Sequence, residues 1–283
     1  MFKTKEEIDT WLTTMKIKNY EIFDDLTVTV NGNVLLDKKN LDSLPVSFNH
    51  IEGFFSVANN KLTSLKGCPY SVRDGFHCEH NLLTSLEYCP QIFDFGGGVF
   101  DCSHNQLTTL EYAPKSTIDD FNCSNNNLTS LLHAPDTVSE DFICDYNQLK
   151  SLEHSPKEVG GHFFCTHNLL ESLEGCPKTI NKNFDISHNK LTSLKNGPSH
   201  IVGNIFANQN NLLSLDDFTT FFGVAITYSG TIIPKFKDFY ITSEAGENIL
   251  QLNYKELQSI RLHEKLQKNI LPKNDVVSDK LKI

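Results

Sequence analysis

The chain has 283 residues, of which 39% are hydrophobic, and its formal net charge at pH 7 is -10. This composition is that of one or two folded domains rather than of a disordered chain, and no stretch approaches the roughly 18 consecutive apolar residues of a membrane-spanning helix. The acidic balance argues against general nucleic-acid binding, which needs a basic surface. We therefore expect neither a nucleic acid nor a membrane as partner.

Residues 1–40 predict a capped helix followed by a hairpin. Thr4 and Glu7 have the spacing of a capping box, and apolar residues follow at helical intervals, which predicts a helix over residues 5–16. The segment LTVTVNGNVLL then places Asn31-Gly32 between two alternating runs, a strong signal for a β-hairpin. We expect these elements to cap the structure that follows, with a docking element as the alternative.

Residues 41–215 consist of near-copies of one segment, such as FDISHNKLTSLKNGP and FNCSNNNLTSLLHAP. Eight asparagines mark the repeat, at spacings of 21, 24 and then five times 21 residues, the longer spacing arising from an insertion around residues 96–98. Each copy has Phe or Ile five residues before its asparagine, a small apolar residue three before, and leucine two and five after. The asparagines are Asn60, Asn81, Asn105, Asn126, Asn147, Asn168, Asn189 and Asn210.

This pattern resembles the leucine-rich repeat, whose consensus is L-x-x-L-x-L-x-x-N-x-L within about 20–29 residues. The short unit, with a proline nine residues after most of the asparagines, is similar to the bacterial class of that family, one branch of which is the effectors of enteric pathogens. It is also similar to repeat proteins encoded by large tailed phages and some giant viruses. The resemblance implies an α/β-type solenoid: a right-handed coil with a parallel concave sheet, a mostly irregular convex side, and helical and hairpin caps.

The residues of the repeat themselves support stacked strands. From six to two residues before each asparagine, outward and inward positions alternate, which predicts a short strand that buries the Phe and the small residue. Successive strands would stack in parallel about 4.8 Å apart. The asparagine would turn inward and hydrogen-bond the neighbouring backbone. A single unit cannot bury its apolar side, so each turn depends on its neighbours.

All eight cysteines occupy two columns of the repeat, where Val, Ile, Ala, Ser or Gly stand in other copies. This interchange indicates that the cysteines are small buried side chains. The sequence contains no Cys-x-x-Cys pair of the kind that binds zinc. Disulfides or a metal site are the alternative. The first ten residues, MFKTKEEIDT, lack the apolar core of a secretion signal. Reduced thiols then predict a cytoplasmic protein, in the host cytoplasm if a phage encodes it.

Residues 216–283 are expected to form a C-terminal cap or a small α+β module. Short strands are predicted around Ser229-Gly230 and in the segment DFYIT, and Asn253 with Glu256 predicts the start of a helix that ends before Pro272. The region has no cysteine, so we do not expect the cysteine-dependent ubiquitin ligase that follows similar repeats in some effectors.

The outward columns of the repeat, six, four and two residues before each asparagine, supply the candidate binding residues. They carry acidic side chains in the middle of the array and apolar ones nearer its ends. The residues expected to contact a partner are His77, Asp101, Asp120, Asp141, Ile143, Asp145, Phe164, Asp185 and Phe206. Residues 41–215 hold 10 basic and 19 acidic side chains, so they carry nearly all of the net charge. This favours a partner with a basic surface, and a merely solvated acidic surface is the alternative.

Histidine stands directly before four of the asparagines, at His80, His104, His167 and His188. Neighbouring strands would bring these rings to about 5 Å in two pairs, close enough to share a metal. Asn, Tyr and Gln fill the same column in other copies, so we expect a polar role at the strand exit and neither a metal nor another cofactor.

No catalytic motif is present: the sequence has neither a phosphate-binding Gly-rich loop nor a Gly-x-Ser-x-Gly elbow. We expect a non-enzymatic interaction module that binds a protein partner through its concave face. By analogy with the family, the partner would be a host protein that a phage or bacterial effector inhibits or redirects. The alternatives are a structural component of a virion or larger complex, and an enzyme with its site in residues 216–283. The oligomeric state stays open.

Overall fold

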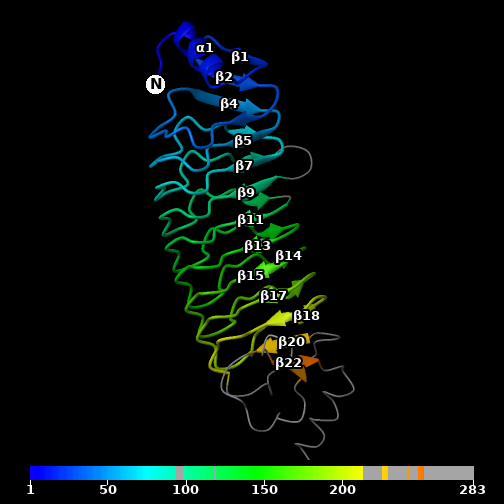
Figure 1. Ribbon diagram of the computed structural model, residues 1–283. Helices are drawn as coiled ribbons and strands as arrows, with labels where there is room; N and C mark the ends of the chain where they lie inside the picture. The colour runs from blue at the N-terminus through cyan, green and yellow to red at the C-terminus, as the bar shows by residue number, and fades with distance from the viewer. Residues whose placement is uncertain (94–97, 118, 213–224, 229–240, 243–247, 252–283) are drawn as a thin grey trace, which may run out of the picture.

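The computed structural model describes residues 1–93, 98–117, 119–212, 225–228, 241–242 and 248–251. They form an elongated stack of turns that begins at the N-terminal helix and ends at β20 and β22 (Figure 1). Each turn contributes one short strand to a long sheet, and most turns contribute a second strand to an adjoining sheet. The solenoid of stacked parallel strands that the repeat predicts is therefore confirmed, with α1 as the only helix within the described ranges.

The long sheet has twelve strands, and all neighbours from β3 to β20 are parallel. The register aligns equivalent positions of successive turns, so that Phe121 lies beside Phe100 and Phe142. The strands are β3 (Val34–Leu35), β5 (Phe54–Ser56), β7 (Gly75–His77), β9 (Val99–Asp101), β11 (Phe121–Asn122), β13 (Phe142–Ile143), β15 (Phe163–Phe164), β17 (Phe184–Asp185), β19 (Ile205–Phe206), β20 (Ala225–Tyr228), β21 (Ile241–Thr242) and β22 (Asn248–Gln251). The last two are antiparallel to their neighbours.

A second row of strands, which was not predicted, comes a few residues before each strand of the long sheet from β3 to β19. It is split into two five-stranded sheets, and the split falls at the repeat that is three residues longer. The first sheet holds β1 (Tyr20–Ile22), β2 (Thr27–Val30), β4 (Ser47–Ile51), β6 (Ser71–Val72) and β8 (Ile92–Phe93). The second holds β10 (Ser116–Thr117), β12 (Thr137–Val138), β14 (Glu158–Val159), β16 (Thr179–Ile180) and β18 (His200–Ile201).

The predicted N-terminal helix is present as α1 (Lys5–Thr14). Thr4 Oγ1 accepts a hydrogen bond from the Glu7 backbone N–H, and the Glu7 carboxylate accepts one from the Thr4 N–H, which completes the capping box. The helix buries Ile8 and Leu12 against the first strands, so it covers the apolar end of the stack.

The predicted hairpin is wrong in its strands. β1 and β2 form the antiparallel pair, whereas the prediction joined β2 to β3 across Asn31-Gly32. β2 and β3 instead pair in parallel with β4 and β5, in two different sheets. Asn31-Gly32 therefore makes the bend that later turns place between their own two strands. Since Val34 aligns with Phe55, the stacking already begins before the first asparagine-marked repeat.

The core is a column of rings backed by leucines and small side chains. Phe55, Phe76, Phe100, Phe121, Phe142, Phe163 and Phe184 are all 0% exposed. Consecutive rings lie with centroids 5.2–6.0 Å apart. All eight cysteines are free and all but Cys176 are buried, which fits the predicted role as small core residues. Burial raises the pKa of the Cys89 thiol to about 12, so it remains protonated at neutral pH.

The asparagines form a second buried column and make the predicted backbone contacts. Asn126 Nδ2 donates to the carbonyl oxygens of Cys102, Cys123 and Ser124 at 3.1–3.2 Å. Its Oδ1 accepts from the Leu107 backbone N–H at 2.9 Å. One amide thus ties its own turn to the preceding one, and the same pattern recurs along the stack.

Of the strands predicted around Ser229-Gly230, the one before it corresponds to β20, and the one after it lies outside the described residues. The strand predicted in DFYIT corresponds to β21. β22 was not predicted. The helix expected from Asn253 lies outside the described residues. No helix in the described part of the chain is long and apolar enough to cross a membrane.

Candidate functional site

The outward face of the long sheet, meaning the residues six, four and two before each asparagine, carries all nine predicted contact residues. His77, Asp101, Ile143, Phe164, Asp185 and Phe206 lie on β7, β9, β13, β15, β17 and β19, while Asp120 and Asp141 directly precede β11 and β13 and Asp145 follows β13. Each of the nine is half-buried. The structure therefore brings them onto one face, in rows along the stack; whether a partner contacts them stays a prediction.

Two apolar side chains of this face lie next to each other on neighbouring strands. Ile143 and Phe164 are paired in register on β13 and β15. The Phe164 ring also stacks on the His162 ring at a centroid distance of 5.2 Å. Phe206 lies beside Asp185 rather than beside another apolar side chain. Ile143, His162 and Phe164 thus make the continuous apolar patch, and Phe206 is separated from it by one strand.

Two of the predicted acidic contacts also have a structural role. Asp120 Oδ1 accepts a hydrogen bond from the Asp141 backbone N–H at 2.9 Å, and Asp141 Oδ1 accepts one from the His162 N–H at 2.7 Å. His162 Nδ1 and Asn183 Oδ1 continue this column by accepting from the next turns. These side chains hold the bend between the two strands of each turn, which explains why only acceptors occur here in the middle of the array.

The remaining carboxylates are also anchored to the backbone. Asp101 and Asp185 each accept a hydrogen bond at 2.9 Å from the N–H two residues further on. Asp145 accepts from the Thr166 N–H of the next turn at 2.5 Å. Burial raises the pKa of Asp101 and of Asp145, against the opposing effect of these hydrogen bonds. The negative charges of the face are therefore held in fixed positions.

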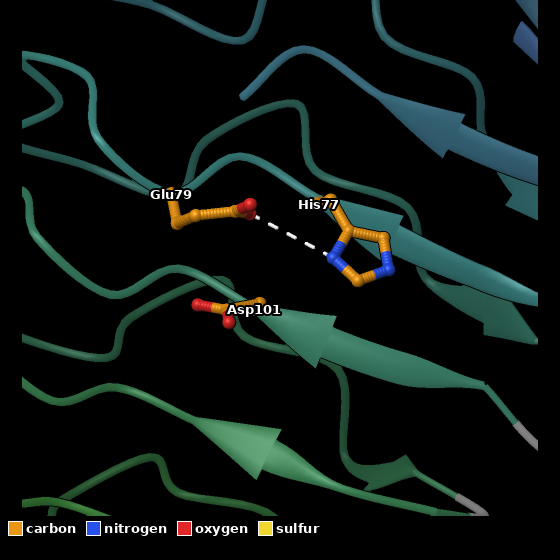
Figure 2. A group of neighbouring side chains, drawn as sticks. All are labelled: His77, Glu79 and Asp101. Atoms are coloured by element: carbon orange, nitrogen blue, oxygen red, sulfur yellow. Dashed lines mark ion pairs between the residues drawn. The ribbon is translucent and has the colours of Figure 1, made fainter. Parts of the chain in front are cut away.

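Three ionisable side chains converge at the N-terminal part of the face, as Figure 2 shows. His77 and Glu79 come from β7 and the residues after it, and Asp101 comes from β9. His77 and Asp101 are among the contact residues predicted from the sequence, whereas Glu79 is not. Glu79 could have been predicted from the alternation of a β-strand. Residues four and two positions before the asparagine point to the same side of the sheet.

The histidine column has a backbone role that the sequence analysis missed. All eight residues directly before the asparagines have left-handed backbone, with φ between 51° and 56°. Asn and His adopt this conformation more readily than most residues, which accounts for their frequency here. The side chains stack: the ring centroids of His80 and His104 are 4.0 Å apart, and His167 lies 4.2 Å from Tyr146 and 4.0 Å from His188.

This ring stack predicts a pH response. Partial burial lowers the pKa of His167, and the neighbouring His188 lowers it further by repulsion. Because the folded state then binds protons less readily than the unfolded state, stability is complete above the ordinary pKa of about 6.5 and falls as the pH drops below it. Replacing His167 by Asn, which occupies this column at Asn59 and Asn125, is expected to reduce the fall in thermal midpoint between pH 7 and pH 5. The same change at the exposed His154 serves as control, and an unchanged pH dependence in the His167 variant would contradict the assignment.

A second exposed surface includes residues that lie seven positions after Asn81 and Asn105. Tyr88 and Tyr112 occupy this column in left-handed backbone and are 50% and 49% exposed. With Tyr70 they border a shallow hollow whose floor includes Cys68 and Cys89. The sequence analysis did not single out these tyrosines, although Gly and Asn in the same column of other copies signal the positive φ.

A comparison with models of known protein families finds no match, and a comparison with curated proteins finds no similar sequence. The repeat and the geometry of its outward face therefore carry the functional interpretation.

Proposed function

We propose that this chain is a leucine-rich-repeat protein of the short bacterial type and that it acts as a non-catalytic scaffold that binds a protein partner. The observation that carries the proposal is the uninterrupted outward face of the long sheet, on which side chains of successive turns lie in register. The 21-residue spacing, the buried leucine pair and the asparagine column support the family assignment.

The partner that fits this face has a basic surface with an apolar centre. Asp120, Asp141 and Asp145 lie within two successive turns, next to the apolar patch of Ile143, His162 and Phe164. Fixed negative charge raises the association rate of a positively charged partner, while an aromatic anchor slows dissociation. Because the carboxylates are already held by the backbone, little side-chain entropy is lost on binding. The resemblance to effector-type and phage-encoded repeats makes a bacterial host protein the first partner to seek.

The test uses substitutions that remove the negative charge of two aspartates but keep an oxygen atom as hydrogen-bond acceptor. In the double variant Asp120→Asn and Asp141→Asn, the amide oxygens replace the carboxylates in their backbone hydrogen bonds, as Asn183 does in the same column. A partner captured from bacterial lysate is expected to associate several-fold more slowly with this variant, and its association rate is expected to depend less on salt. The measurement is association kinetics at two salt concentrations.

The matched control removes the same charge from exposed residues outside the face. The double variant Glu111→Gln and Glu153→Gln changes the net charge by the same amount. Both glutamates are exposed and lie six residues after an asparagine of the repeat. This control should retain most of the association rate. Equal rates for the wild type and for the variant of the face, or equal losses in both variants, would contradict binding through the outward face.

A further inference from the structure

Two adjacent turns place three metal-ligating side chains at one point of the outward face. His77 and Glu79 are two residues apart, so their side chains leave the backbone on the same side. Asp101 is the residue paired with His77 in the register of β7 and β9. Figure 2 shows the His77 imidazole and the Glu79 carboxylate turned towards each other, with the Asp101 side chain beside them on the neighbouring strand. Cys78, between two of these residues, faces the core and is 0% exposed.

The His77 and Glu79 side chains are further apart than a hydrogen bond allows and close to the separation of two ligands of one ion. His77 Nδ1 lies 3.7 Å from Glu79 Oε2, and one ligand atom from each of the three residues lies within 4.8 Å of the others. Hydrogen bonds need about 3.2 Å or less. Two ligands at about 2.1 Å from one ion are roughly 3.0–3.5 Å apart, so a small rotation of the long Glu79 side chain reaches this geometry.

One oxygen of this cluster accepts no hydrogen bond. Glu79 Oε2 is shielded from solvent and accepts no hydrogen bond from the described residues; it faces His77 Nδ1 as an ion pair at 3.7 Å, and the side chain as a whole is 22% exposed. A buried carboxylate oxygen without a donor is costly, and a cation removes that cost. The other carboxylate is oriented: Asp101 Oδ1 accepts from the Ser103 N–H and Oδ2 from Asn122 Nδ2. Such supporting hydrogen bonds are typical around metal ligands.

We propose that His77, Glu79 and Asp101 bind one divalent transition-metal ion, with water at its remaining positions. One imidazole and two carboxylates suit Zn²⁺ and related first-row ions better than Ca²⁺, which takes oxygen ligands. The two carboxylates balance the charge of the ion. The proposal goes beyond the binding of a protein partner and departs from the expectation that the chain holds no metal.

The histidine pair that the sequence analysis considered for a metal is a poorer site. The rings of His80 and His104 are nearly parallel, with 13° between their planes and 4.0 Å between their centroids. The lone pair of an imidazole nitrogen lies in the plane of its ring, so stacked rings direct their lone pairs side by side rather than at a common ion. Only small changes in zinc binding are expected when this pair is removed.

The chain itself supplies replacements for the test, because other turns carry them in the same columns. His77→Asn and Asp101→Asn copy Asn122, and Glu79→Ser copies Ser103 and Ser124. Calorimetric titration of the full chain with Zn²⁺ is expected to give one site in the wild type. Each single variant is expected to bind about tenfold more weakly or worse. Circular dichroism of the metal-free variants verifies that the fold is retained.

The double variant His80→Asn and His104→Asn is the matched control and should retain the wild-type affinity for Zn²⁺. Replacing Zn²⁺ by Co²⁺ adds a second readout, since visible absorption of the bound ion should disappear in the His77 variant. Absence of zinc binding in the wild type would overturn the proposal. So would unchanged binding in the His77 and Glu79 variants, or a loss confined to the His80 and His104 variant. These outcomes leave the partner-binding proposal untouched, because it is measured separately.

Discussion

Replacement of Phe163 by alanine is expected to lower the free energy of unfolding by about 3–5 kcal/mol, whereas the same replacement of Phe164 is expected to cost about 1 kcal/mol or less. Phe163 is 0% exposed and lies between the rings of Phe142 and Phe184, with centroid distances of 5.2 and 5.4 Å. Phe164 is the next residue of β15 and lies on the outward face. Truncation of Phe163 therefore opens a cavity that three turns share. Truncation of Phe164 leaves no enclosed cavity, because that side chain is half-buried and its place is open to solvent.

Denaturant unfolding monitored by circular dichroism provides both values from the same pair of variants. If the Phe163 variant does not fold, the milder Phe163→Leu change should still be clearly more destabilising than Phe164→Leu. Equal effects at the two positions would show that the strand does not separate an inward from an outward face.

Replacement of Asn126 by alanine is expected to lower the free energy of unfolding by about 2–4 kcal/mol. The loss arises mainly at one group: the Leu107 N–H loses its acceptor, Asn126 Oδ1, in a buried position. The carbonyl oxygens are less affected, because that of Cys102 also accepts from the preceding asparagine, Asn105. The change also removes the link between two turns, so cooperativity of unfolding should decrease.

The neighbouring Asn127 is the control, since it is exposed and belongs to the same turn. Asn127→Ala should change stability by no more than about 0.5 kcal/mol. A similar cost at both positions, measured by denaturant unfolding, would contradict the structural role of the buried column.

The inward half of the molecule could be predicted from the sequence because each turn repeats the same physical requirement. A column that contains only Phe or Ile, or only Cys, Val, Ile or Ala, is predicted to be buried. Phe100 and Cys102, which are both 0% exposed, confirm this. The asparagine contacts followed from the same reasoning, since a buried amide needs hydrogen-bond partners.

The parts that could not be predicted depend on three-dimensional relations that no single column expresses. The strands of the second row are only two residues long in most turns, which is too short for an alternating pattern to be recognised in the sequence. The dipeptide Asn31-Gly32 is compatible with a bend as well as with a hairpin turn, so the local sequence does not distinguish the two structures. Asp120 is predicted from the sequence only as a contact for a partner, because its role as a backbone acceptor becomes visible only when the next turn is stacked on it.

The central claim is that equivalent residues of successive turns are displaced by one strand spacing along a single axis. Spin labels carried on non-natural amino acids at exposed positions one residue after the asparagines test it directly, with one label at Lys61 and the second at Gln148 or Lys190. These positions are four and six repeats apart, so the account predicts label separations of about 19 and 29 Å, increasing by about 4.8 Å per turn. Separations that are equal for the two pairs, or that decrease with the number of intervening repeats, would contradict it.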